Sequence, residues 1–390
     1  MAKKKGRADG LKTVTFTFEG KRYYVYGHTK AEAKDKAICR KQELQEKRLK
    51  KSAELTFTEY YERWSEAREG TVKGATIRKQ SFEAAAAAAV TIDDSGAIFG
   101  NLPIKDIEVQ HIRILQKKLL TGTKVTKKGV TKEYKRTTNT VNDIMAFVSH
   151  IFHDAVNERA IDWNPCSGVK PLKRTEQPAR ETIHRALSKE ETRAFMDAAK
   201  GVTDGSKTES PYYGLYQFLL ASGCRVGEAA ALTVSDIKSN GIQINKTVTK
   251  TVEGYHVIGD TPKTEHGKRF IPMTESIRNA VNYQKSINAA LYGTDITRLD
   301  DTVFKTSWGN LLIASNVERD IQAICKKAGI ERFTAHALRA TFATRAIESG
   351  MNPKTLQEIL GHSDIGVTMN VYAHVMDTTK AEEMQNVIAL

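Results

Sequence analysis

The sequence predicts a multidomain, mainly helical protein in which small β-structures lie among many helices. The chain has 390 residues, more than one hydrophobic core usually serves, so two or three domains are expected. Short runs typical of β-strands occur within residues 13–26 and 242–272, whereas apolar residues elsewhere recur at helical spacing. A polar, basic, Pro-containing stretch at 165–178 is typical of an interdomain linker.

The N-terminal segment, residues 1–52, predicts a small α+β module. Alternation in Thr13–Phe18, a turn at Glu19–Gly20 and a second β-type run over Lys21–Tyr26 favour a β-hairpin. A helix is expected from Ala31 to about Lys50, because good helix formers follow a capping box made by Thr29 with Glu32.

This module is strongly basic. Residues 1–51 hold sixteen Lys or Arg against six Asp or Glu, an excess of ten positive charges. The charges are interleaved with aromatic residues at strand spacing, which a disordered tail does not require. Lys21 and Arg22 are therefore candidates for contact with a nucleic acid.

Residues 53–165 predict an all-α domain. Phe57, Tyr60 and Trp64 fall on one helical face, and helices then dominate to about Arg159. Between two of the expected helices lies a basic hairpin or loop. It is either a flexible solvated loop or a set of phosphate contacts. Its cationic residues are Lys124, Lys127, Lys128, Lys132, Lys135 and Arg136.

A linker over residues 166–185 leads to a third domain, expected over 186–375, with a tail over 376–390. Ser188 and Glu191 form a capping box that begins its first helix. Four short β-type runs between residues 242 and 272 indicate a small antiparallel sheet, and helices resume after Glu275. This domain is therefore mostly α with one inserted sheet.

The composition limits the function classes. Sixty Lys and Arg against 46 Asp and Glu give a net charge of +14 and a pI near 9.4, which favours a polyanionic partner such as nucleic acid over a membrane surface. No apolar run is long enough to span a bilayer, so a cytosolic protein is expected. The four cysteines are far apart, which predicts neither disulfides nor a zinc site.

Five residues spread over the third domain carry the most chemical information. His336 and Arg339 lie three apart at a helix start, His362 follows a helix stop at Gly361, and Tyr372 comes ten residues later. Each alone is weak evidence: a surface histidine, a salt-bridged arginine or a core tyrosine is the commoner explanation. Together with Arg225 they suit transfer of a phosphoryl group to a hydroxyl nucleophile.

The ordered set of residues resembles that of the tyrosine recombinase (phage integrase) family. The order of the three modules along the chain resembles that of the integrases of conjugative transposons and other integrative elements. The matching segments are Gly223–Glu228 with Leu232, Lys263–Thr264 before a strand, His336–Arg339, Leu360–His362 and Tyr372. Many members have a histidine after the second arginine, where this chain has Ala340, but that position is not catalytic in the family.

The resemblance implies a role for each residue. Tyr372 would be the nucleophile, Arg225 and Arg339 would bind the non-bridging phosphate oxygens, and His362 would donate a further hydrogen bond. His336 would accept the tyrosine proton and Lys263 would protonate the leaving 5′-oxygen. The alternatives to Lys263 are Lys250, Lys268 and Arg269. The acidic residues Glu228 and Asp236 would orient Arg225 and cap helix starts.

The resemblance also implies the architecture and the partners. The first module would be an arm-site DNA-binding domain with a three-stranded sheet and a helix, the second a SAM-like core-binding domain and the third the catalytic domain. The enzyme would act on double-stranded DNA at core attachment sites and separate arm sites, as a homotetramer linked by the tail. An excisionase or a host DNA-bending protein would assist it in the bacterial cytosol or nucleoid.

No cofactor is expected, because the protein supplies the cations and a covalent 3′-phosphotyrosine conserves bond energy. Two alternatives remain open at this level. A type IB topoisomerase shares the chemistry but relaxes supercoils alone, and a DNA-binding regulator could keep the fold without catalysis.

Overall fold

The computed structural model describes residues 11–18, 20–127, 130–173, 185–201, 209–260, 267–292, 301–366 and 368–369. The chain divides into two compact units, Met1–Glu176 and Gln177–Leu390. Within the described ranges, no helix combines the length and the apolar character that crossing a membrane requires. The finer division into domains stays a prediction.

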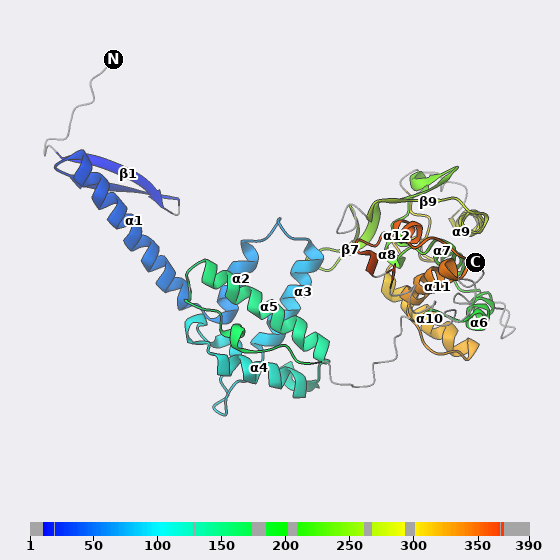
Figure 1. The fold of residues 1–390 in the computed structure, drawn as a ribbon, viewed down its shortest axis with the longest axis horizontal. Coiled ribbons are helices and arrows are strands. Elements are labelled where there is room, and N and C mark those ends of the chain that lie inside the picture. The colour runs from blue at the N-terminus through cyan, green and yellow to red at the C-terminus, as the bar shows by residue number, and fades with distance from the viewer. Residues whose placement is uncertain are drawn as a thin grey trace, which may run out of the picture. The chain divides into compact units, whose positions relative to one another are not determined.

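The first unit begins with a β-hairpin packed on a helix (Figure 1). Strands β1 (Lys12–Phe18) and β2 (Lys21–Gly27) pair antiparallel, and α1 (Lys30–Ala53) follows. The Thr29 hydroxyl accepts Glu32 N at 3.1 Å, as the expected cap requires. The described residues form a two-stranded sheet here, not the three strands implied by the resemblance.

The two faces of this hairpin differ. Apolar residues at alternate positions, with Phe16 stacked on Tyr23, are half-buried. The opposite face exposes the cross-strand pairs Thr13 with Tyr26, Thr15 with Tyr24 and Thr17 with Arg22. Because successive side chains of a strand point to opposite faces, the second face of the hairpin exposes hydroxyl, aromatic and cationic groups to solvent.

The rest of this unit is a helical bundle around its own core. Phe57, Tyr60 and Phe152 are fully buried, Tyr60 Oη donates to Glu158 at 3.0 Å, and Trp64 Nε1 donates to Asp154 at 2.7 Å. The Thr56 hydroxyl caps the first helix of the bundle by accepting Glu59 N. The helices are α2 (Phe57–Glu66), α3 (Gly74–Ala88), α4 (Val109–Thr121) and α5 (Thr138–Asn157), with 3-10 turns at Phe99–Asn101, Ile104–Asp106 and Pro165–Gly168.

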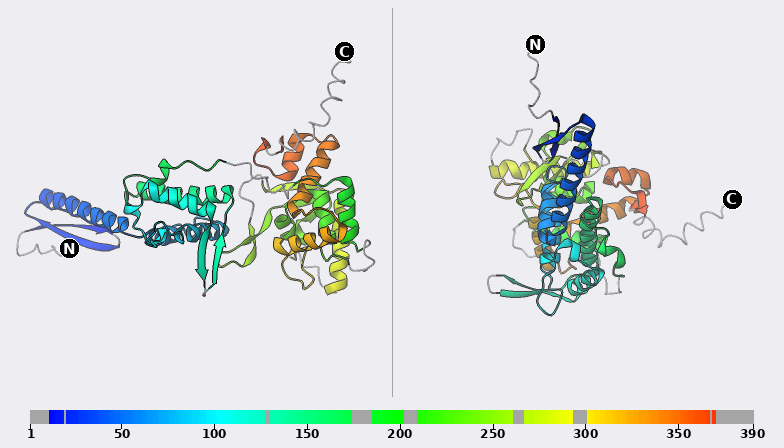
Figure 2. Two further views of the ribbon diagram at one scale, coloured as in Figure 1. Left: turned by 90° about the horizontal axis from the view of Figure 1, so that it is seen from below. Right: turned by 90° about the vertical axis from the view of Figure 1, so that its left-hand side faces the viewer.

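The basic hairpin or loop expected between two helices of this region is a β-hairpin, so the domain expected to be all-α contains two strands. Strands β3 (Thr123–Lys127) and β4 (Val130–Tyr134) form an antiparallel hairpin between α4 and α5. Figure 2 shows it extending beyond the helices that carry it. β-branched Thr and Val residues occupy both arms, and such residues favour an extended backbone over a helix.

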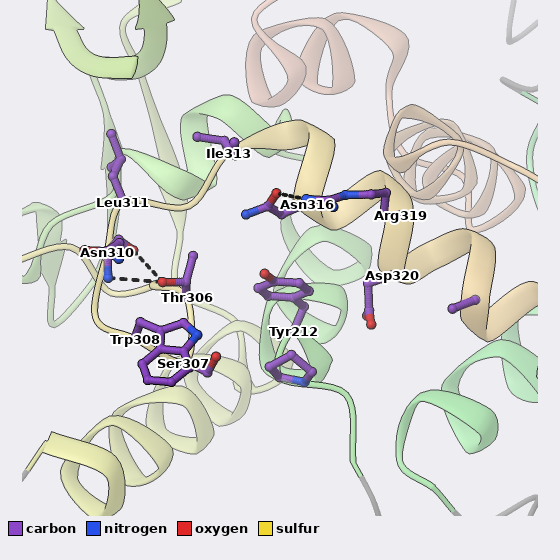
Figure 3. A pocket seen from close by; sticks show the side chains of 12 residues that line it. Tyr212, Thr306, Ser307, Trp308, Asn310, Leu311, Ile313, Asn316, Arg319 and Asp320 are labelled. Carbon is purple, nitrogen blue, oxygen red and sulfur yellow. Dashed lines mark hydrogen bonds between the residues drawn. The ribbon is translucent and has the colours of Figure 1, made fainter. Parts of the chain in front are cut away.

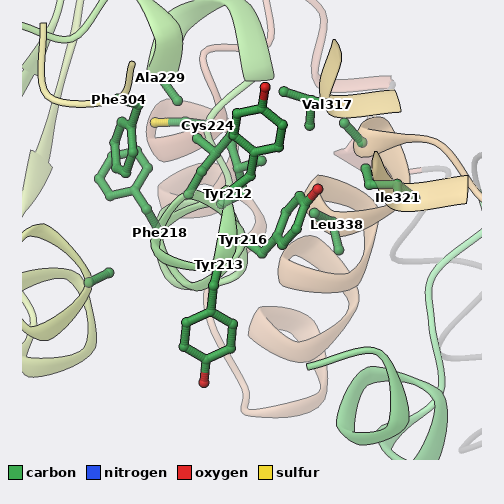
Figure 4. Close-up of a cluster of buried hydrophobic side chains, with 14 of the residues drawn as sticks. Tyr212, Tyr213, Tyr216, Phe218, Cys224, Ala229, Phe304, Val317, Ile321 and Leu338 are labelled. Carbon is green, nitrogen blue, oxygen red and sulfur yellow. The ribbon is translucent and has the colours of Figure 1, made fainter. Parts of the chain in front are cut away.

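The second unit is mostly helical. Its helices are α6 (Lys189–Ala199), α7 (Tyr213–Ser222), α8 (Val226–Ala230), α9 (Glu275–Tyr292), α10 (Ala314–Ala328), α11 (Ala335–Glu348) and α12 (Pro353–Leu360), with a 3-10 turn at Val234–Asp236. The Ser188–Glu191 capping box begins α6 as predicted. In Figure 4, Tyr216, Phe218, Phe304 and Leu338 bring several of these helices together in one core.

One small antiparallel sheet was expected in this unit, and the described residues form two. Strands β5 (Ile237–Lys238), β6 (Gly241–Ile244) and β9 (Arg269–Pro272) make a three-stranded sheet in the order β5-β6-β9. Strands β7 (Lys246–Lys250) and β8 (His256–Asp260) form a separate hairpin inserted between β6 and β9. Asn245, at the junction, is outside both sheets, so the chain leaves one sheet before it starts the other.

Candidate active site

Arg339 brings three distant parts of the second unit together. It lies on the first turns of α11, and its side chain is buried, with 3% of the residue exposed. Its Nη1 donates to Gly223 O at 2.9 Å and its Nη2 donates to Leu360 O at 2.7 Å. Because Arg225 and His362 each follow one of these carbonyls by two residues, Arg339 places both beside it.

The two carbonyls that Arg339 contacts belong to helix ends. Gly223 is the C-cap of α7 with φ 64°, and Gly361, with φ 67°, is the C-cap of α12 directly after Leu360. Both glycines adopt the left-handed conformation that other residues avoid, and a Cβ on Gly223 would lie 2.4 Å from the Phe342 ring. The negative ends of two helix dipoles therefore converge on a buried cation.

Arg225 is the accessible arginine of the site. It is the N-cap of α8, and its side chain is 41% exposed. Glu228 orients it from both ends: Glu228 Oε2 accepts Arg225 N at 2.9 Å, and Oε1 accepts Arg225 Nη1 at 2.8 Å. A guanidinium has five N–H donors, so an edge of Arg225 can still bind an anion from solvent.

Buried charge sets the pKa values around these arginines. Burial alone would raise the pKa of Glu228, but the Arg269 guanidinium, aided by Arg225, lowers it to about 2. Burial, together with the charge of Arg225, lowers the pKa of Arg339 to about 9. At neutral pH the carboxylate and the guanidinium groups are therefore all charged.

His362 is neutral at physiological pH. Burial, followed by the positive charge of Arg339 and Arg225, lowers its pKa to about 4. Its Nδ1 lies 2.9 Å from the hydroxyl of Thr368, which is itself buried. If that hydroxyl donates to Nδ1, the ring proton is on Nε2, where a neutral imidazole can donate to an anion.

His336 is exposed on the first turn of α11, and its charge contributes to the low pKa of His362. Thr334, the N-cap residue of α11, makes no side-chain cap bond; instead Glu318 Oε1, on α10, accepts Ala335 N at 2.9 Å. The start of this helix is thus fixed by a neighbouring helix and not by its own N-cap side chain.

The structure brings together four of the six predicted catalytic residues: Arg225, His336, Arg339 and His362. Lys263 and Tyr372 lie outside the described residues. Of the alternatives to Lys263, Arg269 is buried in an ion pair with Glu228, whereas Lys268 is exposed. Lys268 lines a pocket of about 420 Å³ together with His362 and Lys354.

The predicted DNA-contact residues are in the first unit. Lys21 and Arg22 are exposed at the start of β2, and the guanidinium of Arg22 lies 5.9 Å from the centre of the Tyr24 ring. Lys124, Lys127 and Lys132 are on β3 and β4, Lys135 is exposed after them, Arg136 is half-buried and Lys128 lies outside the described residues. Whether they touch DNA stays a prediction.

A larger pocket in the second unit contains none of the predicted catalytic residues. It has a volume of about 580 Å³, and Tyr212, Trp308, Leu311 and Arg319 are among its lining residues (Figure 3). Trp308 is 86% exposed on a turn that is closed by hydrogen bonds between Thr306 and Asn310. The larger pocket is therefore not lined by the residues at which the charges of Arg225, Arg339 and Glu228 converge.

Two contributors to the site carried little signal in the sequence. Arg269 was considered as an alternative proton donor and not as a buried ion-pair partner, although it faces inward in a strand with strictly alternating burial. Thr368 follows His362 by six residues and belongs to none of the motifs that mark the site in the sequence. Its contact with His362 depends on the path of the loop, which local patterns do not specify.

Comparison with known proteins decides the family. Residues 185–379 match the model described as the phage integrase family. The chain belongs to this family. The matched region contains all six predicted catalytic positions.

Curated members of this family resemble the chain at moderate identity. The "Tyrosine recombinase XerC-like" protein of Caldanaerobacter subterraneus subsp. tengcongensis is 28% identical over 64% of this chain and 66% of its own length. The "Transposase from transposon Tn916" of Enterococcus faecalis is 27% identical over 63% of this chain and 61% of its own length. The chain therefore matches less than two thirds of either relative.

Solved structures of integrases share the fold. The "Tn1549 transposon Integrase", solved "in complex with a circular intermediate DNA", has a TM-score of 0.65 at 23% identity, covering 85% of this chain and 99% of that one. A "lambda integrase dimer bound to a COC' core site" has a TM-score of 0.57 at 17% identity, covering 94% of this chain and 93% of that one. At such identities the likeness concerns the fold.

Proposed function

We propose that this phage integrase family member is a site-specific DNA recombinase that cleaves and rejoins DNA for integration and excision of a mobile element. The observation that carries the proposal is the pair of hydrogen bonds from Arg339 to Gly223 O and Leu360 O. They assemble two arginines and two histidines from segments more than a hundred residues apart in the sequence. The relatives described as a tyrosine recombinase and as a transposase support the same activity.

In the proposed reaction, the Tyr372 oxygen attacks phosphorus and the bond from phosphorus to the 5′-oxygen breaks. A phenol ionises at about pH 10, so Tyr372 transfers its proton to His336 as it attacks. Lys263 gives a proton to the departing 5′-oxygen. The result is a 3′-phosphotyrosine, and attack by a 5′-hydroxyl reverses every bond change and religates DNA.

The described residues suit stabilisation of the phosphate charge. Arg225 presents an exposed guanidinium edge, while Arg339 contributes a fixed buried charge and holds the surrounding backbone. His362 is uncharged at neutral pH, so its role is to donate a hydrogen bond from Nε2. Binding at preorganised donors stabilises the transition state without reorganisation at the moment of reaction.

The remaining modules would hold DNA and assemble the complex. The exposed hairpin face with Arg22 and Tyr24 would bind arm sites, and residues 53–165, with the basic β3–β4 hairpin, would bind the core site. The tail over 376–390 would contact a neighbouring protomer in a tetramer on DNA. An excisionase or a host DNA-bending protein would set the direction, and the reaction would take place in the bacterial cytoplasm.

A nicked attachment-site substrate tests the proposal. With the nick close to the scissile bond, cleavage releases a short fragment that carries the free 5′-hydroxyl. Once this fragment diffuses away, the DNA cannot be religated, and the covalent adduct accumulates as a band resistant to denaturant. We expect an adduct from the wild-type protein and none from Tyr372→Phe, which keeps the ring and should bind DNA equally well. A protein that binds the site but gives no adduct would instead be a non-catalytic regulator.

A second assay separates recombination from relaxation of supercoils. Two differently labelled attachment sites should yield exchanged products in which DNA from one site is joined covalently to DNA from the other. A type IB topoisomerase would relax a plasmid without such a site and would give no exchanged product. Plasmid relaxation with no strand exchange would therefore contradict the proposal.

A further inference from the structure

Arg269 is a buried cation for which the proposed chemistry has no role. Its side chain is 4% exposed, so a DNA phosphate cannot replace its present partners without rearrangement. Nη1 and Nη2 donate to the two oxygens of Glu228 at 3.1 and 2.7 Å, and Nε donates to Ile359 O at 2.6 Å. One side chain on β9 thereby joins the start of α8 to the last turn of α12.

Those two connected helix ends carry residues of the site. Arg225 is the N-cap of α8, and His362 follows the last residue of α12 by two positions. The acceptor Ile359 O is adjacent in sequence to Leu360 O, which accepts Arg339 Nη2. Arg269 and Arg339 therefore hold the same helix end, one from β9 and the other from α11.

Without Arg269, Glu228 would weaken the positive field of the site. Glu228 is 2% exposed and already bonds Arg225 through both of its oxygens. Arg225, Arg339 and the Glu228 carboxylate together leave one positive charge, and Arg269 raises this to two. Salt screens buried charges poorly, so the difference acts on an anion bound at Arg225.

We propose that Arg269 is a positioning residue of the recombinase site, which neutralises Glu228 so that Arg225 keeps its charge for the DNA phosphate, and which holds the His362 end of α12. The inference rests on the proposed function. It deepens that function by adding a third guanidinium that acts through Glu228 and not by contact with DNA. A merely structural ion pair would affect stability but would leave the chemistry of His362 unchanged.

The pKa of His362 in the full-length protein without DNA is the first readout. His362 is surrounded by Arg339, Arg225, His336 and Arg269, with the Thr368 hydroxyl at Nδ1. Arg269→Gln should raise this pKa, measured by NMR titration of the imidazole, because one of the nearby positive charges is lost. Lys246→Gln is the matched control: it breaks the ion pair between Lys246 and Asp236, at 2.8 Å in the same domain, and should leave His362 unchanged.

The rate of adduct formation on the nicked substrate is the second readout. Arg269→Gln should slow the reaction by roughly 10- to 100-fold, less than the loss of a donor that contacts the phosphate directly. Adding Glu228→Gln restores the net charge of two and removes the unmatched buried carboxylate, so the double variant should recover at least about fivefold of that loss. Arg269→Lys keeps the charge and should retain a rate within about tenfold of wild type.

Three outcomes would overturn the inference. They are a His362 pKa that is the same in Arg269→Gln and in wild type, a double variant as slow as the single one, and an Arg269→Lys protein that is folded but inactive. If the unmatched carboxylate prevents Arg269→Gln from folding, the double and lysine variants decide, because both keep the net charge. A wild-type protein that gives no adduct refutes the proposed function instead, and the His362 titration then still tests the position of Arg269.

Discussion

Two buried arginines of the second unit and the cations of the N-terminal hairpin carry the same charge in opposite surroundings. Arg269 and Arg339 are almost fully buried, and each donates to backbone carbonyls or a carboxylate. Lys21 and Arg22 are exposed on a two-stranded sheet, beside Tyr24, which is 55% exposed. In the first region cations are fixed by the fold, whereas in the second they are displayed on it.

A positively charged residue in a protein that binds DNA therefore has two distinct uses. Exposed cations bind phosphates by releasing counterions, and their effects on affinity add up and weaken with salt. Buried cations act together on one reacting phosphate, because the low dielectric strengthens each interaction and links their pKa values. The exposed cations should therefore control the affinity for DNA, and the buried cations should control the rate of cleavage.

Replacing Arg225 by alanine should give the largest effect. Its exposed edge is the part of the cluster that a phosphate can reach, so we expect adduct formation to fall by roughly 10²- to 10³-fold. Affinity for the core site should change much less, and the thermal midpoint should stay close to wild type because the side chain is 41% exposed. A variant that binds DNA weakly but cleaves bound DNA at the normal rate would break the comparison.

Replacing Arg22 by alanine should give a smaller effect of the opposite kind. We expect affinity for arm-site DNA to fall a few-fold, and the slope of log K against log salt to decrease by about 0.9. Cleavage of a saturated core-site substrate should not change. Lys36→Ala is the control on α1, where the lysine is already paired with Glu32 at 2.7 Å and should contribute less to the salt slope.

The smallest expected effect is a change in how stability depends on pH. The pKa of His362 falls from its ordinary value of 6.5 to about 4 on folding, so between these values the unfolded chain binds a proton that the folded protein does not. Stability due to this residue therefore decreases as pH falls from 6.5 towards 4.

His362→Gln should remove that contribution, and its thermal midpoint should depend less on pH across this window than that of the wild type. We expect a difference on the order of 2 °C between the two ends of the window, since His362 is only half-buried. Parallel curves for the two proteins, measured by circular dichroism, would show that the buried cations do not control this histidine.

The sequence predicted local structure well wherever the signal itself was local. The Ser188–Glu191 box begins α6, the Thr29 hydroxyl caps α1, and Gly361 ends α12 in the left-handed conformation. These features need one short segment and one chemical preference each. The β3–β4 segment was predicted only as a hairpin or a loop, and the split of one expected sheet into two was not predicted, because pairing partners are chosen by the surrounding fold.

The candidate site divides in the same way. The residue types and order of Arg225, His336, Arg339 and His362 are visible in the sequence and indicate phosphoryl transfer before any contact is known. The different roles of these four residues cannot be derived from the sequence. The sequence does not distinguish an arginine that is exposed at a helix start, like Arg225, from one that is buried against helix ends, like Arg339.

The chemical groups of the site, the family pattern and the helix ends that carry a cap or stop signal are thus already present in the sequence, since these depend on residue types and on neighbours along the chain. The folded arrangement is needed to see which cations are buried, which carboxylate pairs with them and why His362 is neutral at physiological pH. The physical reason is that burial and charge pairing depend on distances between segments such as 223–228, 269 and 359–362, which no local pattern encodes.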